Sequence, residues 1–167
     1  DYGALGMTGV SVDLLTRQPL RVVVDSRCQI SGSARIFKRP GETLIATTDG
    51  VPQRARADDL RSSQVDIHFF PAKNEQVDLE SLLRYLADRG CNNVMVEAGA
   101  ILAGAFVGQG LLDEIVCYCA PKLFGSNARP MFDLPIETID AHLALTLVDM
   151  CKIGEDIRVT FRPDHDY

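Results

Sequence analysis

The sequence predicts an α/β fold whose mainly parallel sheet carries an antiparallel edge. Short apolar strands alternate with helical patterns over most of the 167 residues, and this alternation is typical of parallel sheets. Two alternating segments separated by a short turn close the chain, which is typical of an antiparallel hairpin. Apolar residues make up 46% of the chain, so one domain of this length has enough of them to form a core.

The first part of the chain contains three predicted strands. Each is a short apolar or alternating run bounded by turn residues, at positions 20–25, 43–47 and 65–70. One helical turn is predicted at 33–37, after the first strand. A polar and weakly helical segment at 53–63 follows the second strand. These elements give the strand–helix–strand order that a parallel sheet requires.

The clearest predicted helix spans residues 78–90. Four leucines repeat there at positions i, i+3, i+4 and i+7, and they are Leu79, Leu82, Leu83 and Leu86. Asp78 is the candidate N-cap of this helix, and Gly90 is the candidate stop after its last turn. The leucine face is expected to pack on the sheet.

The second part of the chain begins with a predicted strand at 92–97 and a predicted helix at 99–110. A further strand is predicted at 114–120. The last two segments, 142–153 and 157–162, alternate in polarity and are separated by Gly-Glu-Asp, so they predict a hairpin.

Charge and composition exclude several classes of protein. The formal net charge of −6 and the pI of about 5.0 argue against a nucleic-acid partner, which normally meets a basic face. No apolar run approaches the roughly 18 residues that span a membrane, and we expect no membrane partner. Five cysteines without a C-x-x-C pair indicate reduced thiols of a cytoplasmic protein. Cys117 and Cys119 are interpreted as packing residues, so no metal site is predicted.

The stretch VEAGAILAGAF, residues 96–106, is the strongest candidate for a functional site. A strand, a glycine turn and a helix form a phosphate-binding unit in many α/β proteins, because the first helical turn presents free N–H groups. Glu97 lies at the predicted carboxyl end of the strand, where ligands bind in open sheets. A structural alternative is equally compatible with the spacing. In that alternative Glu97 caps the helix, and the alanines and glycines only allow close packing.

The usual dinucleotide fingerprint is missing from the sequence. No G-x-G-x-x-G motif follows a strand, and no acidic residue is predicted to close a second strand about 20 residues further on. The chain also lacks the G-x-x-x-x-G-K-[ST] motif. A Rossmann dehydrogenase and a P-loop enzyme are therefore disfavoured.

Three segments together resemble the reductase domain of the bacterial RibD family of riboflavin biosynthesis. They are RQPLRVVVDS (17–26), VMVEAGAILAGAFVGQGLLDEIVCYCAPKLFGSNARPMF (94–132) and IGEDIRVTFRP (153–163). The resemblance covers nearly the whole chain. It implies a dihydrofolate-reductase-like fold, with a mixed and mostly parallel sheet flanked by helices and antiparallel strands at the C-terminus.

The resemblance also implies an activity and a set of site residues. The expected reaction is the NADPH-dependent reduction of the ribosyl side chain of 5-amino-6-(5-phosphoribosylamino)uracil, a phosphorylated pyrimidine. Glu97 is implied to contact the substrate. Ser26 is implied to contact NADPH, and Arg27 to supply charge for its 2′-phosphate. The remaining implied NADPH contacts are Gly99, Ala100, Ile101, Leu102, Ala103, Gly104 and Ala105.

The chain departs from the family pattern in two ways. The zinc-binding deaminase motifs are absent, so zinc and deamination are not predicted for these residues. The start of the family's reductase domain does not precede Asp1 either. We therefore expect residues 1–167 to be a single reductase domain without its N-terminal part and without the upstream deaminase domain.

Some questions stay open at this level. The family implies a homodimer, with the late strands as a candidate contact. No general acid is identified, because His68, His142 and His165 are each interpreted as structural or surface residues. Two other functions remain possible, a reductase of this fold that acts on a pterin and a non-catalytic dimerisation module.

Overall fold

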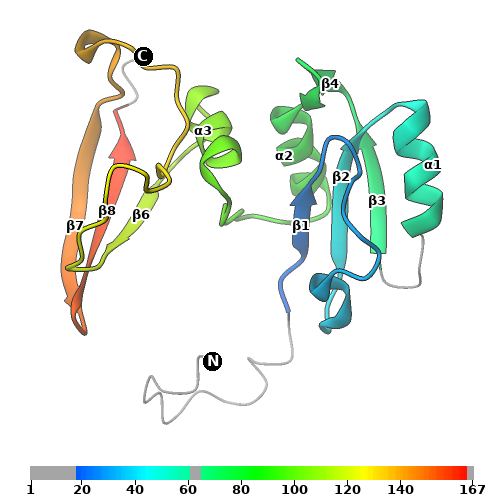
Figure 1. The fold of residues 1–167 in the computed structure, drawn as a ribbon, viewed down its shortest axis with the longest axis horizontal. Helices are drawn as coiled ribbons and strands as arrows, with labels where there is room; N and C mark the ends of the chain where they lie inside the picture. Colours follow the sequence, from blue (N-terminus) through cyan, green and yellow to red (C-terminus); the bar gives the residue numbers. More distant parts are fainter. Residues whose placement is uncertain (1–17, 61–64, 165–167) are drawn as a thin grey trace. The chain divides into compact units, whose positions relative to one another are not determined.

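The computed structural model describes residues 18–60 and 65–164 (Figure 1). The chain divides into two compact units, Asp1–Cys91 and Asn92–Tyr167, and each is described by itself. Within the described ranges, no helix has both the length and the apolar character needed to cross a membrane.

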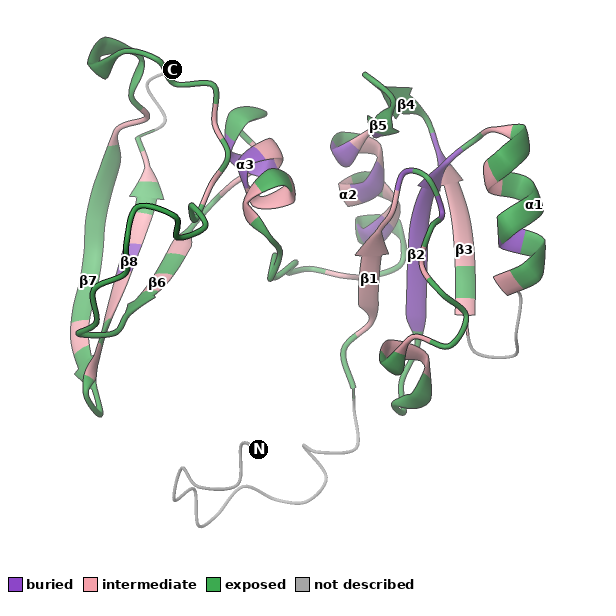
Figure 2. Ribbon diagram, viewed as in Figure 1, coloured by how far each residue is buried: buried purple, intermediate pink, exposed green. Residues whose placement is uncertain are grey.

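The first unit contains a parallel three-stranded sheet in the order β1-β2-β3. Its strands are β1 (Arg21–Val24), β2 (Thr43–Thr48) and β3 (Val65–Phe70), and all three match predicted strands. Every residue of the central strand β2 is buried, as Figure 2 shows. A strand buried on both faces explains why residues 43–48 carry only threonine and apolar side chains.

Two helices of the first unit cover opposite faces of β3. The helices are α1 (Val51–Leu60) and α2 (Leu79–Asp88). The guanidinium of Arg54 in α1 lies 5.1 Å from the ring centroid of Phe69, whereas Tyr85 in α2 stacks on His68 with centroids 4.1 Å apart. Neighbouring strand residues point to opposite faces, so the two helices lie on opposite sides. This confirms the predicted flanking of the sheet by helices.

The leucine periodicity correctly identifies helix α2. Leu79, Leu82 and Leu86 are buried, each at most 3% exposed. Gly90 has a φ of +82°, and its N–H donates to the carbonyl of Ala87, while Cys91 donates to Leu86. These two hydrogen bonds form a Schellman motif, so Gly90 is the predicted stop.

Two short elements complete the first unit. A 3₁₀ turn at Arg35–Lys38 (η2) corresponds to the helical turn predicted at 33–37. The strands β4 (Ala72–Lys73) and β5 (Gln76–Val77) form a hairpin. Both of its turn residues have positive φ, as a type I′ turn requires, and they are Asn74 and Glu75.

The second unit combines one helix with an antiparallel sheet. The helix is α3 (Ala100–Gly108), and the strands are β6 (Ile115–Cys119), β7 (Leu145–Ile153) and β8 (Asp156–Pro163), in the order β6-β8-β7. A 3₁₀ turn, η3 (Ile139–Ala141), precedes β7. The strands β7 and β8 form the predicted hairpin, and its two-residue turn begins with Gly154 at a φ of +62°. Parallel strands early and antiparallel strands late confirm the predicted α/β class.

The strand predicted at 92–97 is absent, so this prediction was wrong. The segment forms no strand, and Val94, Met95 and Val96 are 44%, 83% and 40% exposed. A β-strand exists only through hydrogen bonds to a partner, and no strand of the described residues pairs with this segment. The apolar residues of segment 92–97 favour a β-strand, but they do not indicate which other strand could pair with it.

Candidate functional site

Ser26 lies at the carboxyl end of β1 and is only 8% exposed. Its hydroxyl donates to Oε1 of Gln76 at 2.9 Å and accepts from the N–H of Val77 at 3.0 Å. Its carbonyl oxygen accepts from Oγ1 of Thr48 at 2.7 Å. Ser26 therefore ties the end of β1 to β2 and to β5. The hydroxyl of Ser26, the predicted cofactor contact, therefore already has two hydrogen-bond partners within the protein.

Arg27 follows on the surface, and its side chain has no hydrogen bond or ion pair among the described residues. Its carbonyl oxygen accepts from Nη1 of Arg56 at 2.9 Å. The carboxylate of Asp25, which no sequence motif indicated, holds the same loop. Oδ2 of Asp25 accepts from the N–H groups of Gln29 and Ile30 at 2.6 and 2.7 Å. The exposed guanidinium of Arg27 is thus presented by an ordered turn.

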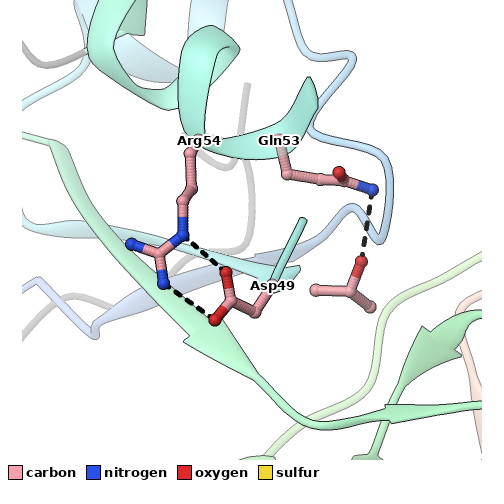
Figure 3. A network of polar contacts seen from close by, with 4 residues as sticks. Asp49, Gln53 and Arg54 are labelled. Atoms are coloured by element: carbon pink, nitrogen blue, oxygen red, sulfur yellow. Dashed lines mark hydrogen bonds and ion pairs between the residues drawn. The ribbon is translucent and has the colours of Figure 1, made fainter. Parts of the chain in front are cut away.

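The carboxyl end of β2 carries buried oxygen atoms without partners. Oγ1 of Thr47 and Oε1 of Gln53 are buried and make no hydrogen bond to any described atom. The amide nitrogen of Gln53 lies 3.4 Å from Oγ1 of Thr48 (Figure 3). Because buried polar atoms nearly always have a partner, these two oxygens indicate that a water or a ligand group belongs at this end of the strand.

An acidic residue closes the second strand after all. Asp49 directly follows β2 and is held by Arg54 in the first turns of α1. The expectation that no acidic residue would end a second strand was therefore wrong. The predicted strand ends at Thr47, two residues before the aspartate. The predicted strand is one residue shorter than β2 at its carboxyl end, and the glycine motif of the fingerprint remains absent from the sequence.

Helix α3 begins without any side-chain cap. Gly99 occupies the N-cap position, no side chain bonds to the first turn, and no acidic residue lies within it. A Cβ atom built on Gly99 meets no described atom within 4 Å. The N-terminus of α3 therefore presents its free N–H groups and partial positive charge next to open space.

Glu97 precedes this helix and is exposed. Its carboxylate has no hydrogen bond or ion pair among the described residues. The alternative in which Glu97 caps α3 was wrong, because the cap residue is Gly99 and the cap carries no side-chain bond. A carboxylate without protein partners, two residues before a helix N-terminus, remains available to a ligand.

Gly104 has a packing role inside the second unit. It is buried, and a Cβ atom built on it would overlap the backbone carbonyl oxygen of Asp133. The N–H of Asp133 donates to the carbonyl of Ala100 at 3.0 Å, so the chain near Asp133 lies directly on α3. The tight-packing alternative therefore explains Gly104. Nothing in the spacing of the sequence pointed to Asp133 as the neighbour.

The other predicted contacts of α3 differ in exposure. Ile101 is 77% exposed, and four residues are half-buried, namely Ala100, Leu102, Ala103 and Ala105. Phe106 and Val107 are buried and anchor the helix. Ser26 and Arg27 belong to the first unit, whereas Glu97 and residues 99–105 belong to the second. Each group is thus a candidate site within its own unit.

The histidines provide no evident proton donor. His68 stacks between strand and helix against Tyr85, and Nδ1 of His142 lies 2.7 Å from the carbonyl oxygen of Ile139. His165 lies outside the described residues. Within the described ranges, no three His, Cys, Asp or Glu side chains form a group suited to a metal ion. Sγ of Cys117 lies 3.7 Å from Sδ of Met131, and burial raises the pKa of this thiol.

Comparison with known proteins connects these features to one family. The family described as the RibD C-terminal domain matches residues 4–159. The riboflavin biosynthesis protein RibD of Chlamydia trachomatis is 43% identical over 143 residues, which are 84% of this chain and 37% of that protein. A Buchnera aphidicola protein is named 5-amino-6-(5-phosphoribosylamino)uracil reductase. It is 28% identical over 148 residues, which are 88% of this chain and 69% of that protein.

Solved structures agree with this match. Acinetobacter baumannii RibD superposes with a TM-score of 0.72 at 30% identity, over 89% of this chain and 38% of that chain. The chain spans 37% to 40% of the length of three RibD relatives, those of Chlamydia trachomatis, Chlamydia muridarum and Escherichia coli. The predicted family and dihydrofolate-reductase-like fold are confirmed. This chain belongs to the family of RibD C-terminal domains.

Proposed function

We propose that this chain reduces the ribosyl side chain of 5-amino-6-(5-phosphoribosylamino)uracil to the ribityl form, with NADPH as the cofactor. The family match over residues 4–159 carries the proposal, together with the reductase named in Buchnera aphidicola. The free carboxylate of Glu97 beside an uncapped helix N-terminus supports it, because the proposed substrate carries both hydroxyl groups and a phosphate.

The described residues fit a dinucleotide in two respects. The N-terminus of α3 has free N–H groups, and Gly99 leaves room for a ligand to approach the backbone. At the carboxyl end of β2, the buried oxygens of Thr47 and Gln53 lack donors, and a nucleotide has hydroxyl and amino groups to supply them. In the proposal Ser26 and Arg27 of the first unit, and residues 99–103 and 105 of the second, contact NADPH, which would supply the hydride when bound.

Glu97 binds the substrate in this proposal. Its carboxylate accepts hydrogen bonds from hydroxyl groups of the sugar and fixes the orientation of the carbon to be reduced. Because α3 carries no charged side chain between Ala100 and Gly108, the field at its N-terminus comes from the backbone alone. We assign no residue as the general acid.

Replacing Glu97 tests the proposal directly. In the full-length protein, Glu97→Gln should lower turnover of the phosphoribosylamino substrate at least about tenfold, while NADPH affinity stays within about twofold. Turnover is followed by NADPH oxidation, and affinity by titration. The control is Glu155→Gln, because Glu155 is an exposed glutamate in the β7–β8 turn and should leave both quantities unchanged.

Two results would contradict the proposal. Unchanged turnover of Glu97→Gln would remove the role given to this residue. Oxidation of NADPH with a dihydropterin, and none with the phosphoribosylamino substrate, would replace the proposed substrate by the pterin alternative.

We also propose a cytoplasmic homodimer whose subunits join this reductase domain to a deaminase domain. The fact that this chain covers only 37% to 40% of three RibD relatives supports the fusion. The five cysteines are all free, which supports a reducing compartment. Mass spectrometry of the native protein, isolated from cells, tests the fusion, because a native mass near that of 167 residues would contradict it.

A further inference from the structure

An ion pair between Asp49 and Arg54 lies at the carboxyl end of β2. Neither residue is among those proposed above to bind the substrate or NADPH. Nε and Nη2 of Arg54 donate to the two carboxylate oxygens of Asp49 at 2.7 and 2.8 Å (Figure 3). This two-pronged geometry is the strongest arrangement available to such a pair. Phe69 supports the guanidinium from β3, with the ring centroid 5.1 Å away. The pair is exposed, since the side chains of Arg54 and Asp49 are 61% and 53% accessible to solvent.

The location of the pair is where a parallel sheet binds nucleotides. Asp49 follows β2 directly, and the adjacent end of β1 is tied to it through Thr48 and Ser26. Ligands bind outside the carboxyl ends of the strands in such sheets. The buried and unpartnered Oε1 of Gln53, one residue before Arg54, independently indicates a donor group at the same end.

A carboxylate in this position has a defined effect on a dinucleotide. An acidic side chain at the end of a strand accepts a hydrogen bond from a ribose 2′-hydroxyl, and it repels a 2′-phosphate. A neighbouring arginine reverses this preference. The hydrogen bond from Arg54 lowers the pKa of Asp49, so the carboxylate remains ionised at neutral pH. Its charge is therefore cancelled by the arginine and not by a proton.

We propose that the Asp49–Arg54 pair sets the choice between the phosphorylated and unphosphorylated nicotinamide cofactors. Arg54 neutralises the carboxylate that would otherwise repel a 2′-phosphate, and it offers a guanidinium to that phosphate. Asp49 in turn holds Arg54 over Phe69 at the end of β2. The inference rests on the proposed function, since it concerns the cofactor of the same reaction.

Binding measurements on three variants test the inference. Dissociation constants for NADPH and NADH are measured by titration of the full-length protein and of Arg54→Gln, Asp49→Asn and the double variant. Arg54→Gln leaves an unpaired carboxylate and should lower the preference for NADPH over NADH about fivefold or more. Asp49→Asn should preserve or raise this preference, because the positive charge remains. The double variant removes both charges and should lie between the two single variants.

Salt and a matched pair provide the controls. The loss of NADPH affinity in Arg54→Gln should become smaller when the salt concentration rises from about 0.05 M to about 0.5 M, because salt screens an exposed charge. The control is Arg84→Gln, which opens the exposed Glu80–Arg84 pair of α2 and should leave the preference unchanged.

The outcomes separate this inference from the proposed function. Wild-type protein that binds neither dinucleotide would overturn both. Wild-type protein that binds NADPH, with a preference that Arg54→Gln leaves unchanged, would overturn only the role of the pair. If Arg84→Gln lowers the preference for NADPH as much as Arg54→Gln does, the role of the Asp49–Arg54 pair is also overturned. The change would then not depend on the position of the charge that was removed.

Discussion

Two glycines of one helix segment illustrate how differently the same residue type is used. Gly99 at the N-cap of α3 borders open space, whereas Gly104 in the same helix lies against the backbone of Asp133. Neither requires a positive φ, so backbone freedom explains neither residue. The first glycine leaves room for a ligand, and the second leaves room for the protein itself.

Valine at each of these positions should separate the two roles. Gly104→Val should lower the free energy of unfolding by about 3 kcal/mol, because the new side chain overlaps the carbonyl oxygen of Asp133. Gly99→Val should cost only about 1 kcal/mol, the penalty of a poor N-cap residue. It should nevertheless weaken NADPH binding clearly. The measurements are urea denaturation and NADPH titration of both variants.

The same pair of variants contains its own control. Each receives an identical side chain in the same helix, so a general effect of valine on α3 would appear in both. Normal NADPH affinity of Gly99→Val would remove the cofactor role of this position. An equal loss of stability in both variants would contradict the close approach at Gly104.

At the scale of elements, α2 shows how much a local pattern determines. Its leucine spacing, its N-cap residue Asp78 and its terminal glycine lie within 13 consecutive positions, 78–90, and each occupies the predicted position, although the side chain of Asp78 makes no capping hydrogen bond. Segment 92–97 shows the opposite case, since its apolar residues indicated a strand that has no partner in the described chain. A helix satisfies its hydrogen bonds internally, whereas a strand depends on a distant segment.

Truncating the leucines of α2 tests its packing. Leu82 is 2% exposed, and Leu82→Ala should lower the free energy of unfolding by about 3 kcal/mol through lost burial and an unfilled cavity. Leu83 is half-buried, so Leu83→Ala should lose less than half as much. Denaturant titration of both variants checks the ratio. Equal losses would mean that the burial of the two leucines differs little in solution.

At the scale of the whole molecule, the antiparallel sheet of the second unit presents an apolar surface. Nearly all of β7 is exposed, as Figure 2 shows, and its exposed residues include Leu147 at 55% and Met150 at 63%. The register places both beside apolar residues of β8, since Leu147 pairs with Phe161 and Met150 with Val159. An apolar sheet face of this kind is typical of a subunit contact.

A charge on this face should disrupt the proposed homodimer. Leu147→Lys should convert a dimer into a monomer, because burying a lysine without a partner is costly. Light scattering after size-exclusion chromatography measures the mass of each variant. The control is Val116→Lys, which places the same charge on the opposite face of the sheet, since Val116 pairs with Thr160 and not with Phe161. A monomeric wild-type protein, or a monomeric control beside a dimeric Leu147→Lys, would contradict this contact.

The sequence by itself determined the class of fold, most helices and strands, the hairpin at the end and the family. All of these features follow from periodicity and from motifs of neighbouring residues, and both can be identified in the amino-acid sequence alone. Only the tertiary structure decided that 92–97 lacks a strand partner, that Gly104 meets Asp133, and that Arg54 lies over the ring of Phe69. Strand pairing, close backbone approach and ring contacts join residues far apart along the chain, so no local pattern encodes which residues meet.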